Sequence, residues 1–300
     1  MNRNQVKSAS YSGSGWSQAF TDFGLLVKFK LTLLVLFSAV MSYAIVAEGN
    51  VTWAGMLMLT LGGFFVTGAA NALNQVLERD YDRLMTRTSN RPLVTGRMTV
   101  STAVLLAGLM ALLGICLLSL FNPLTGFLGT LSLICYAFVY TPMKRTTPLA
   151  VVVGAIPGAL PLIIGCVAYE GGISSTAFML FTLQFLWQFP HFWAVAWVTD
   201  EDYKKAGFYL LPSKNGEKDK TTGLLSFAFC LLMVGNASAA YWMGDLGLTA
   251  MLILNTLNLY WAWYCWKLFK TCSATAARRQ MFISFMHLPV SLIVILLDRI

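Results

Sequence analysis

The chain consists largely of apolar runs of about 20 residues, each long enough for a helix to cross the hydrocarbon core of a membrane. It is 57% hydrophobic and only 11% charged, whereas a soluble domain carries about 25% charged residues. Nine such runs cover residues 29–48, 53–78, 100–120, 124–141, 149–169, 174–199, 222–243, 247–268 and 280–298. We therefore predict an all-α polytopic membrane protein, in which nine transmembrane helices form a bundle.

The positions of the basic residues support this arrangement. All Lys and Arg residues except Arg299 lie on one side of the membrane if the chain crosses it nine times. Because loops rich in Lys and Arg stay in the cytoplasm, we expect the N-terminus and the long loops of this multi-pass protein on the cytoplasmic side of the cell's inner membrane. The same topology accounts for the net charge of +8, so no nucleic-acid partner is expected.

The chain divides into a short polar segment and one long apolar domain. Residues 1–26 are Ser-rich and are predicted to form a flexible cytoplasmic tail, and residues 27–300 a single transmembrane domain. Two connections, 79–99 and 200–221, are long, and each begins with acidic and continues with basic residues. We expect these two loops to meet over one central cavity that opens toward the cytoplasmic side.

A segment rich in carboxylate and amide side chains lies at the end of the second apolar run. On an ideal helix Asn71, Asn74, Glu78 and Asp82 share one face, whereas Asp80 points to the other side. Carboxylates at this depth are unfavourable unless they hold a cation or a charged partner. Mg²⁺ prefers oxygen ligands and completes its shell with water and substrate phosphates. The pattern favours a metal–diphosphate site; the alternative is a solvated helix end with charge pairs four residues apart.

Basic side chains near this segment could bind the phosphate groups of such a ligand. Arg87 and Arg91 follow the acidic residues, and Lys144 and Arg145 stand in a turn bounded by two prolines. A guanidinium group matches the geometry of phosphate oxygens, which favours this interpretation. The alternative is that these charges only set the topology of the chain.

A second polar cluster lies in the sixth apolar run. Gln184, Gln188, His191 and, beyond the end of the run, Asp202 are predicted to share one helix face. Aromatic residues flank His191, and this combination indicates a large flat ligand or a haem iron. The alternative is a histidine that packs between helices by hydrogen bonding, which is also our interpretation of His287.

In these segments the chain resembles the UbiA-type intramembrane prenyltransferases, and within them the branch that acts on haem. The motifs, in family order, are Asn74-x-x-x-Glu78-x-x-x-Asp82 continuing to Arg-Pro-Leu93, Tyr140-Thr-Pro-x-Lys-Arg145, Gln188-Phe-Pro-His-Phe-Trp193 and Asp200-Glu-Asp-Tyr-x-x-Ala-Gly207. The resemblance covers residues 27–297. It implies a nine-helix bundle around a central cavity and Mg²⁺-dependent transfer of a farnesyl group from farnesyl diphosphate to a vinyl group of haem b, which yields haem O for terminal oxidases.

The resemblance also implies roles for three groups of residues. The Mg²⁺ on the diphosphate would be held by Asn74, Glu78 and Asp82, with help from Asp202. The leaving diphosphate would be neutralised by Arg87, Arg91, Lys144, Arg145 and Lys205. Haem b would contact His191, Gln188 and Trp193. The implied partners are farnesyl diphosphate, haem b, the lipid bilayer, and a haem A synthase or an oxidase assembly factor.

Two features depart from the wider family pattern. Glu78 stands where the family often has Asp, and the second motif lacks another acid four residues on, because Lys204 follows Asp200. Two other functions are alternatives: a sister prenyltransferase with a quinone-precursor or chlorophyll-like acceptor, and a transporter or channel. A transporter would place polar residues near the membrane midplane and on both sides, whereas here they gather at one end.

Overall fold

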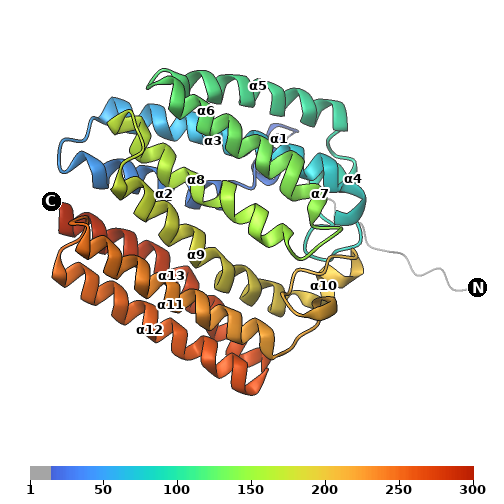
Figure 1. The fold of residues 1–300 in the computed structure, drawn as a ribbon. Coiled ribbons are helices and arrows are strands. Elements are labelled where there is room, and N and C mark those ends of the chain that lie inside the picture. The colour runs from blue at the N-terminus through green and yellow to red at the C-terminus, as the bar shows by residue number, and fades with distance from the viewer. Residues whose placement is uncertain (1–14) are drawn as a thin grey trace, which may run out of the picture.

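The computed structural model describes residues 15–300, and the regular elements in this part of the chain are all helices (Figure 1). The long helices are α2 (Phe29–Ala47), α3 (Trp53–Asp82), α5 (Val100–Ser119), α6 (Pro123–Ile134), α8 (Ala150–Glu170), α9 (Ser175–Val198), α11 (Lys220–Trp242), α12 (Leu248–Thr271) and α13 (Ala274–Arg299). The short helices α4 (Pro92–Thr95), α7 (Thr141–Met143) and α10 (Asp200–Lys205) lie at one end of the bundle, which we call the loop end (Figure 1). The opposite end is called the far end.

Within residues 15–300, seven helical stretches are long and apolar enough to cross a membrane. They are α2, α3, α5, the stretch Pro123–Met143 that joins α6 to α7, α8, α11 and α13. Helices α9 and α12 have 24 residues each, but polar side chains such as Gln188 and Asn258 reduce their mean hydropathy. The helix bounds lie close to the expected runs, except that α13 begins at Ala274 rather than at residue 280 and that α6 ends at Ile134, where a π-helical turn continues the run expected to end at residue 141.

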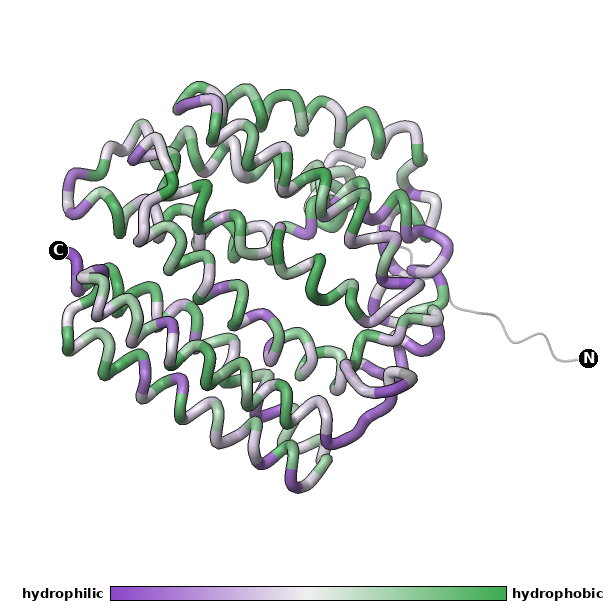
Figure 2. The backbone as a smooth tube through the Cα atoms, in the orientation of Figure 1, coloured by the Kyte–Doolittle hydropathy of each residue, from purple (hydrophilic) through white to green (hydrophobic). Residues whose placement is uncertain are grey.

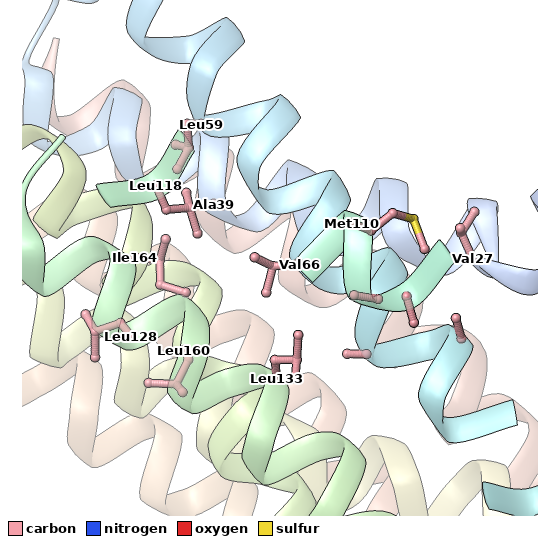
Figure 3. Close-up of a cluster of buried hydrophobic side chains, with 14 of the residues drawn as sticks. Val27, Ala39, Leu59, Val66, Met110, Leu118, Leu128, Leu133, Leu160 and Ile164 are labelled. Atoms are coloured by element: carbon pink, nitrogen blue, oxygen red, sulfur yellow. The ribbon is translucent and has the colours of Figure 1, made fainter. Parts of the chain in front are cut away.

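Of the three hydrophobic clusters formed by the described residues, one surrounds Met85, Trp193 and Phe208, and the other two fill the middle of the bundle. One lies among α2, α3, α5, α6 and α8, and Figure 3 shows Leu59, Val66, Leu118 and Ile164 in the space between these helices. The other lies among α8, α9, α11, α12 and α13. Figure 2 shows that hydrophilic segments gather at the loop end, whereas the middle of the helices is mostly hydrophobic. The polar residues that could carry chemistry are therefore concentrated near the loop end.

Part of the expected tail forms a helix. Residues 1–14 of that tail lie outside the described residues, but Gly15–Leu26 form helix α1, so the prediction of a flexible tail was wrong for these twelve residues. Asp22 is buried and accepts a hydrogen bond from Arg97 Nε at 2.9 Å. Trp16 and Phe20 are exposed. Large aromatic side chains are typical of the membrane–water interface, so α1 has the composition of an interfacial helix anchored through Asp22.

One arginine connects several helix ends at the far end of the bundle. The Arg299 guanidinium donates to Glu48 Oε1 at 2.8 Å and to Thr176 Oγ1 at 2.8 Å. Its Nη2 atom also lies 3.4 Å from Asp245 Oδ1. Because these partners stand after α2, in the first turn of α9 and between α11 and α12, Arg299 holds the two halves of the bundle together at this end.

Helices α2 and α8 approach each other so closely that only glycine fits at position 165. A Cβ atom there would overlap the carbonyl oxygen of Ala39 and the hydroxyl oxygen of Ser42. Small residues allow membrane helices to pack at short distance, where dispersion contacts hold them together. This contact fixes the position of α2. The N-terminal end of α2, directly after Lys28, adjoins the candidate site.

Candidate active site

The last turns of α3 carry a buried stripe of oxygen-bearing side chains at the loop end. Asn74, Glu78 and Asp82 are 0%, 3% and 1% exposed, respectively, and recur every four residues, so they lie above one another on one helix face. Asp80 points to the other side, where its side chain is 71% exposed. The helical period alone thus separates the two kinds of acidic residue in this segment.

Each side chain of this stripe contacts a different cationic side chain. Lys144 Nζ lies 2.5 Å from Glu78 Oε1, and Arg91 forms an ion pair with Asp82. Lys28 Nζ donates to Asn74 Oδ1 at 2.7 Å. Buried carboxylates are strongly disfavoured without such partners, so these cations account for the stability of the stripe. We call Lys28, Lys144 and Arg91 the three site cations.

A π-helical turn, η1 (Cys135–Tyr140), forms the wall opposite α3. Turns of this kind are often found at functional sites, because the extra residue redirects the side chains that follow. Thr141 Oγ1 accepts a hydrogen bond from Asn74 Nδ2 at 3.0 Å. The Tyr136 hydroxyl lies 3.4 Å from Asn71 Oδ1 and 3.3 Å from Lys28 Nζ. The amide of Asn74 is therefore oriented with its oxygen toward Lys28 and its nitrogen toward Thr141, the first residue of α7.

The chemistry of the stripe fits a hard divalent cation that shares its shell with a substrate. Within the described part of the chain, Asp82 Oδ1 is buried without a hydrogen-bond donor, so this carboxylate has an unused acceptor. Residues 15–300 contain no group of three or more His, Cys, Asp or Glu side chains that could hold a metal by themselves. Two carboxylates and one amide oxygen would leave coordination positions for phosphate oxygens, which is the arrangement that Mg²⁺ favours.

The two long loops meet at this end, as predicted. Asp202, in α10, accepts hydrogen bonds from the backbone N–H groups of Thr86 at 2.8 Å and Arg87 at 3.1 Å. Lys205 donates to Thr86 Oγ1 at 3.1 Å, and Arg87 donates to the Tyr203 hydroxyl at 3.2 Å. Asp202 thus holds the loop that carries Arg87, and both its oxygens have partners. Its assignment as a metal ligand stays a prediction.

The hydrogen bonds to Asp202 have a measurable consequence. Partial burial acts to raise its pKa, but the N–H groups of Arg87 and Thr86 and the Lys205 ammonium outweigh this effect and hold the pKa at about 2. A carboxylate with a depressed pKa contributes stability above its unfolded-state pKa of about 4, and the contribution is lost as the pH falls toward the folded-state value.

Asp202→Asn should therefore lower the midpoint of thermal unfolding by a few degrees at pH 7. The difference between variant and wild type should fade as the pH falls below about 4. Differential scanning fluorimetry of the detergent-solubilised protein measures both effects. Asp80→Asn is the matched control, because Asp80 is exposed and contacts Arg79; an equal shift in this control would contradict the role given to Asp202.

Arg145 and Lys144 are neighbours in sequence but have different surroundings. Arg145 Nη2 donates to the Leu77 carbonyl at 2.6 Å, and its guanidinium lies 4.1 Å from the centre of the Tyr81 ring. Lys144 instead contacts Glu78. Both residues line a cavity of about 470 Å³ that lies between segments 144–148 and 209–217. Lys144 therefore adjoins both this cavity and Glu78.

The residues of the second predicted polar cluster, Gln184, Gln188, His191 and Asp202, contact different parts of the structure. Gln184 and Gln188 donate to the carbonyls of Gly158 and Ala155, at 2.7 and 3.0 Å, and so contact α8. Nδ1 of His191 lies 2.7 Å from the Ser284 hydroxyl of α13. Asp202 lies in α10, beyond the break at Thr199 that follows α9. Gln184, Gln188 and His191 lie within a 60° sector of α9, as predicted, although their side chains contact different helices. The prediction was wrong for Asp202, because the helix breaks at Thr199.

The aromatic residues around His191 form a packed group. The ring of His191 stacks on Trp187 with a centroid distance of 4.5 Å, and Phe285 lies 5.4 Å away. Trp193 is buried against Phe189 and Phe229, with centroid distances of 5.5 Å to each. His191 thus stands between α9 and α13, whereas Trp193 belongs to the packing between α9 and α11.

Sequence reasoning missed three residues that complete the site: Lys28, Tyr136 and Thr141. Lys28 was interpreted only as a topological charge in front of the first apolar run. Lys28 comes directly before the first run, and the start of that run lies at the same end of the bundle as the end of the second run. This position could have indicated that Lys28 lies near Asn74. Tyr136 and Thr141 gave no signal, because nothing in the sequence indicates the π-helical turn that directs them toward α3.

A model of the UbiA prenyltransferase family matches residues 35–287, and the chain belongs to this family. The chain is 41% identical over 283 residues to the protoheme IX farnesyltransferase of Cytophaga hutchinsonii, covering 94% of this chain and 98% of that one. It is 40% identical over 287 residues to the protoheme IX farnesyltransferase of Flavobacterium psychrophilum, covering 93% and 95% of the two chains.

Solved structures share the fold. Digeranylgeranylglyceryl phosphate synthase is similar with a TM-score of 0.79 and 18% identity, covering 94% of this chain and 99% of that chain. A UbiA homolog from Archaeoglobus fulgidus bound to GPP and Mg²⁺ is similar with a TM-score of 0.65 and 16% identity, covering 91% and 99%. At these identities the likeness is one of fold.

Proposed function

We propose that this protein transfers a farnesyl group from farnesyl diphosphate to a vinyl group of haem b, with haem O and diphosphate as products. The observation that carries the proposal is the 41% identity with the Cytophaga hutchinsonii protoheme IX farnesyltransferase over 94% of the chain. The buried stripe of α3 and its three cations supply what a diphosphate leaving group needs. The UbiA homolog solved with GPP and Mg²⁺ further supports a metal–diphosphate site in this fold.

The reaction breaks the C–O bond of farnesyl diphosphate, the π bond of the vinyl group and one O–H bond of water, and it forms one C–C bond and one C–O bond. The C–O bond between the farnesyl carbon and the diphosphate breaks, and negative charge develops on the diphosphate. The terminal vinyl carbon of haem b then bonds to the allylic carbon, which leaves a cation on the porphyrin side chain. Water adds to that cation and loses a proton, giving the hydroxyethyl group of haem O. The barrier of the first step falls if positive charge is already in place around the leaving group.

The residues at the loop end provide that positive charge. Mg²⁺ held by Asn74, Glu78 and Asp82 would supply Lewis-acid stabilisation of the departing diphosphate. Lys144 and Arg91 adjoin these ligands directly. Cations held in a site of low dielectric stabilise developing charge more strongly than they would in water.

The joined loops supply further charge and hold it in place. Arg87 and Lys205 stand at the contact between the loops and would bind outer diphosphate oxygens. Asp202 fits a role in positioning this loop pair, with any metal contact secondary. Arg145 is bound to the Leu77 carbonyl and fits a positioning role for Lys144.

On the acceptor side, His191 is the residue best placed to bind haem iron. Its Nδ1 is engaged by Ser284, which leaves Nε2 for a further partner. Phe285 beside it is 43% exposed, so this seam between α9 and α13 borders the outer surface, where an apolar substrate dissolved in lipid would arrive. Gln188 and Trp193 are buried on the same helix and would hold His191 in place through α8 and α11.

The proposal includes a topology. Helices α9 and α12 would cross the membrane together with the seven more apolar stretches, giving nine spans around a central cavity. The loop end would face the cytoplasm, because it carries the basic loops. The product would pass to a haem A synthase or an oxidase assembly factor, and residues 27–300 would act as one transmembrane domain.

Membranes containing the protein should convert haem b to haem O when farnesyl diphosphate and Mg²⁺ are supplied. Mass spectrometry of the extracted pigment should show a haem heavier by a farnesyl group and a hydroxyl group. His191→Ala should reduce this product at least about tenfold while leaving the binding of farnesyl diphosphate unchanged. Formation of a prenylated quinone precursor in place of a modified haem would contradict the proposal and support the sister activity.

A further inference from the structure

The end of α12 and the start of α13 carry positive charges that have no acidic partners. Lys267 and Lys270 lie in the last two turns of α12, and Arg278 and Arg279 lie in the first two turns of α13. The sequence contains no Asp or Glu in residues 246–297. Within the described part of the chain, none of the four cations lies within ion-pair distance of a carboxylate. We call these four residues the hairpin cations.

The hairpin cations lie at one level of the bundle. Helix α12 ends at Thr271 and α13 begins at Ala274, so the two helices form a tight antiparallel hairpin whose connection lies at the loop end (Figure 1). At a rise of 1.5 Å per residue, the four cations lie within about 8 Å of these helix ends. Lys270, Arg278 and Arg279 are exposed. The hairpin therefore presents a concentrated positive charge at the surface of the loop end.

Aromatic rings take the place of acidic partners for the two lysines. Lys267 Nζ lies 4.9 Å from the centre of the Tyr264 ring and 5.2 Å from the centre of the Trp263 ring. Lys270 Nζ lies 5.1 Å from the centre of the Trp266 ring. An ammonium group is attracted to the face of a ring, but this contact uses none of the acceptors that its N–H groups require. Both lysines therefore remain able to bind an anion.

The outward face of α12 changes in character along the helix. Leu252, Leu259 and Trp263 follow one another toward the loop end, and each is more than half exposed. On an ideal helix the two leucines, Lys267 and Lys270 all lie within about 40° of Trp263. The opposite face is buried in the bundle and carries Trp261, Cys265 and Leu268. One outward stripe thus runs from aliphatic side chains through aromatic rings to ammonium groups.

This order of groups matches the profile of a phospholipid leaflet. Leu259 lies about 17 Å below Lys270 along the helix, which is about half of the roughly 30 Å of hydrocarbon in a bilayer. With Leu259 in the middle of the membrane, Lys270 is at the level of the lipid headgroups. Tryptophan and tyrosine side chains favour the zone just below that level, where Trp263 and its aromatic neighbours lie.

We propose that the hairpin cations form a binding site for the headgroup of an anionic phospholipid in the leaflet at the loop end. The lysines of α12 and the arginines of α13 approach one phosphate from two helices, and the outward stripe of α12 contacts the acyl chains. A zwitterionic lipid carries its own ammonium group beside the phosphate, so it gains less from these cations. The bound lipid joins the ends of α12 and α13. The inference rests on the proposed crossing of the membrane by α12 but not on the reaction.

Native mass spectrometry of the full-length protein in detergent tests the proposal by counting bound lipid molecules. Phosphatidylglycerol should bind at least about tenfold more tightly than phosphatidylcholine, because each basic residue near the surface adds to the attraction of an anionic lipid. The difference should shrink as the salt concentration rises. The double variant Lys267→Gln, Lys270→Gln should lose roughly tenfold in affinity for phosphatidylglycerol and keep its affinity for phosphatidylcholine.

The matched control is the double variant Lys30→Gln, Arg83→Gln, which removes two exposed cations from the same end of the bundle. It should bind phosphatidylglycerol as the wild type does. An equal loss in this control would overturn the proposal, as would equal binding of the two lipids by the wild type. Displacement of phosphatidylglycerol by glycerol 3-phosphate would show that a free phosphate, and not a lipid, is the ligand. The variant Arg278→Gln, Arg279→Gln gives the same test if the lysine variant does not elute as a folded species.

Discussion

Asp82→Asn should reduce the rate of farnesyl transfer by roughly 10²- to 10³-fold, because a neutral amide would hold Mg²⁺ on the leaving diphosphate much less strongly than a carboxylate does. The substitution keeps the size and shape of the side chain, so packing around this buried residue changes little. It replaces an anion that pairs with Arg91 and has an unused acceptor oxygen with a neutral amide. The rate of haem O formation in isolated membranes measures the effect.

Asp80→Asn is the control for this prediction. Asp80 lies two residues away on the same helix, but its side chain is 71% exposed and pairs with Arg79. The control should therefore retain wild-type activity. Comparable losses in both variants would show that the acidic segment acts through its overall charge, and full activity of Asp82→Asn would remove the metal assignment. A symmetric size-exclusion peak in detergent establishes that both variants are folded.

Gly165→Val should be the most destabilising single substitution of those considered for the bundle. Any Cβ at this position overlaps the backbone of α2 at Ala39, so the two helices must separate. Overpacking in a well-packed core commonly destabilises by about 1–3 kcal/mol. For a chain of this size we expect the thermal midpoint to fall by roughly 5–10 °C. Scanning fluorimetry of the detergent-solubilised protein measures the midpoint.

Gly235→Val provides the comparison for this substitution. Gly235 lies in α11, and none of the described residues outside its own helix has an atom within 4 Å of a Cβ built there. The same change of side chain should therefore leave the midpoint nearly unchanged. A similar fall in both variants would mean that valine destabilises these helices in general, and the close contact between α2 and α8 would lose its importance.

Helix positions and the face of the α3 stripe could be predicted from the sequence, because both follow from a repeating local geometry. The period of the helix places Glu78 and Asp82 together and Asp80 apart without knowledge of any other helix. Hydrophobic runs locate membrane helices because lipid requires every backbone polar group to be satisfied within the segment. The meeting of the two long loops was also predicted, from their equivalent positions in the chain, and is confirmed by the contacts of Asp202.

The partners of the stripe could not be predicted, because they depend on turns and on contacts between helices. The neighbours Lys144 and Arg145 face different surroundings, and a turn bounded by prolines does not reveal which one points inward. Lys28 reaches the site because its own backbone adopts a left-handed conformation, which residues other than glycine rarely adopt. Helix α1 was missed because its serine-rich surroundings masked the spacing of Trp16 and Phe20, which is that of an amphipathic helix.

The apolar cluster around Leu59, Val66 and Ile164 has an electrical consequence. A membrane potential of 100 mV changes the free energy of each elementary charge that crosses the membrane by about 2.3 kcal/mol. The ionic groups of the site lie at the loop end, and the apolar side chains of this cluster pack among α2, α3, α5, α6 and α8. In this part of the described chain the packing forms a layer of low dielectric. This apolar layer would oppose the passage of the charges of the site, or of a charged leaving group, toward the far end.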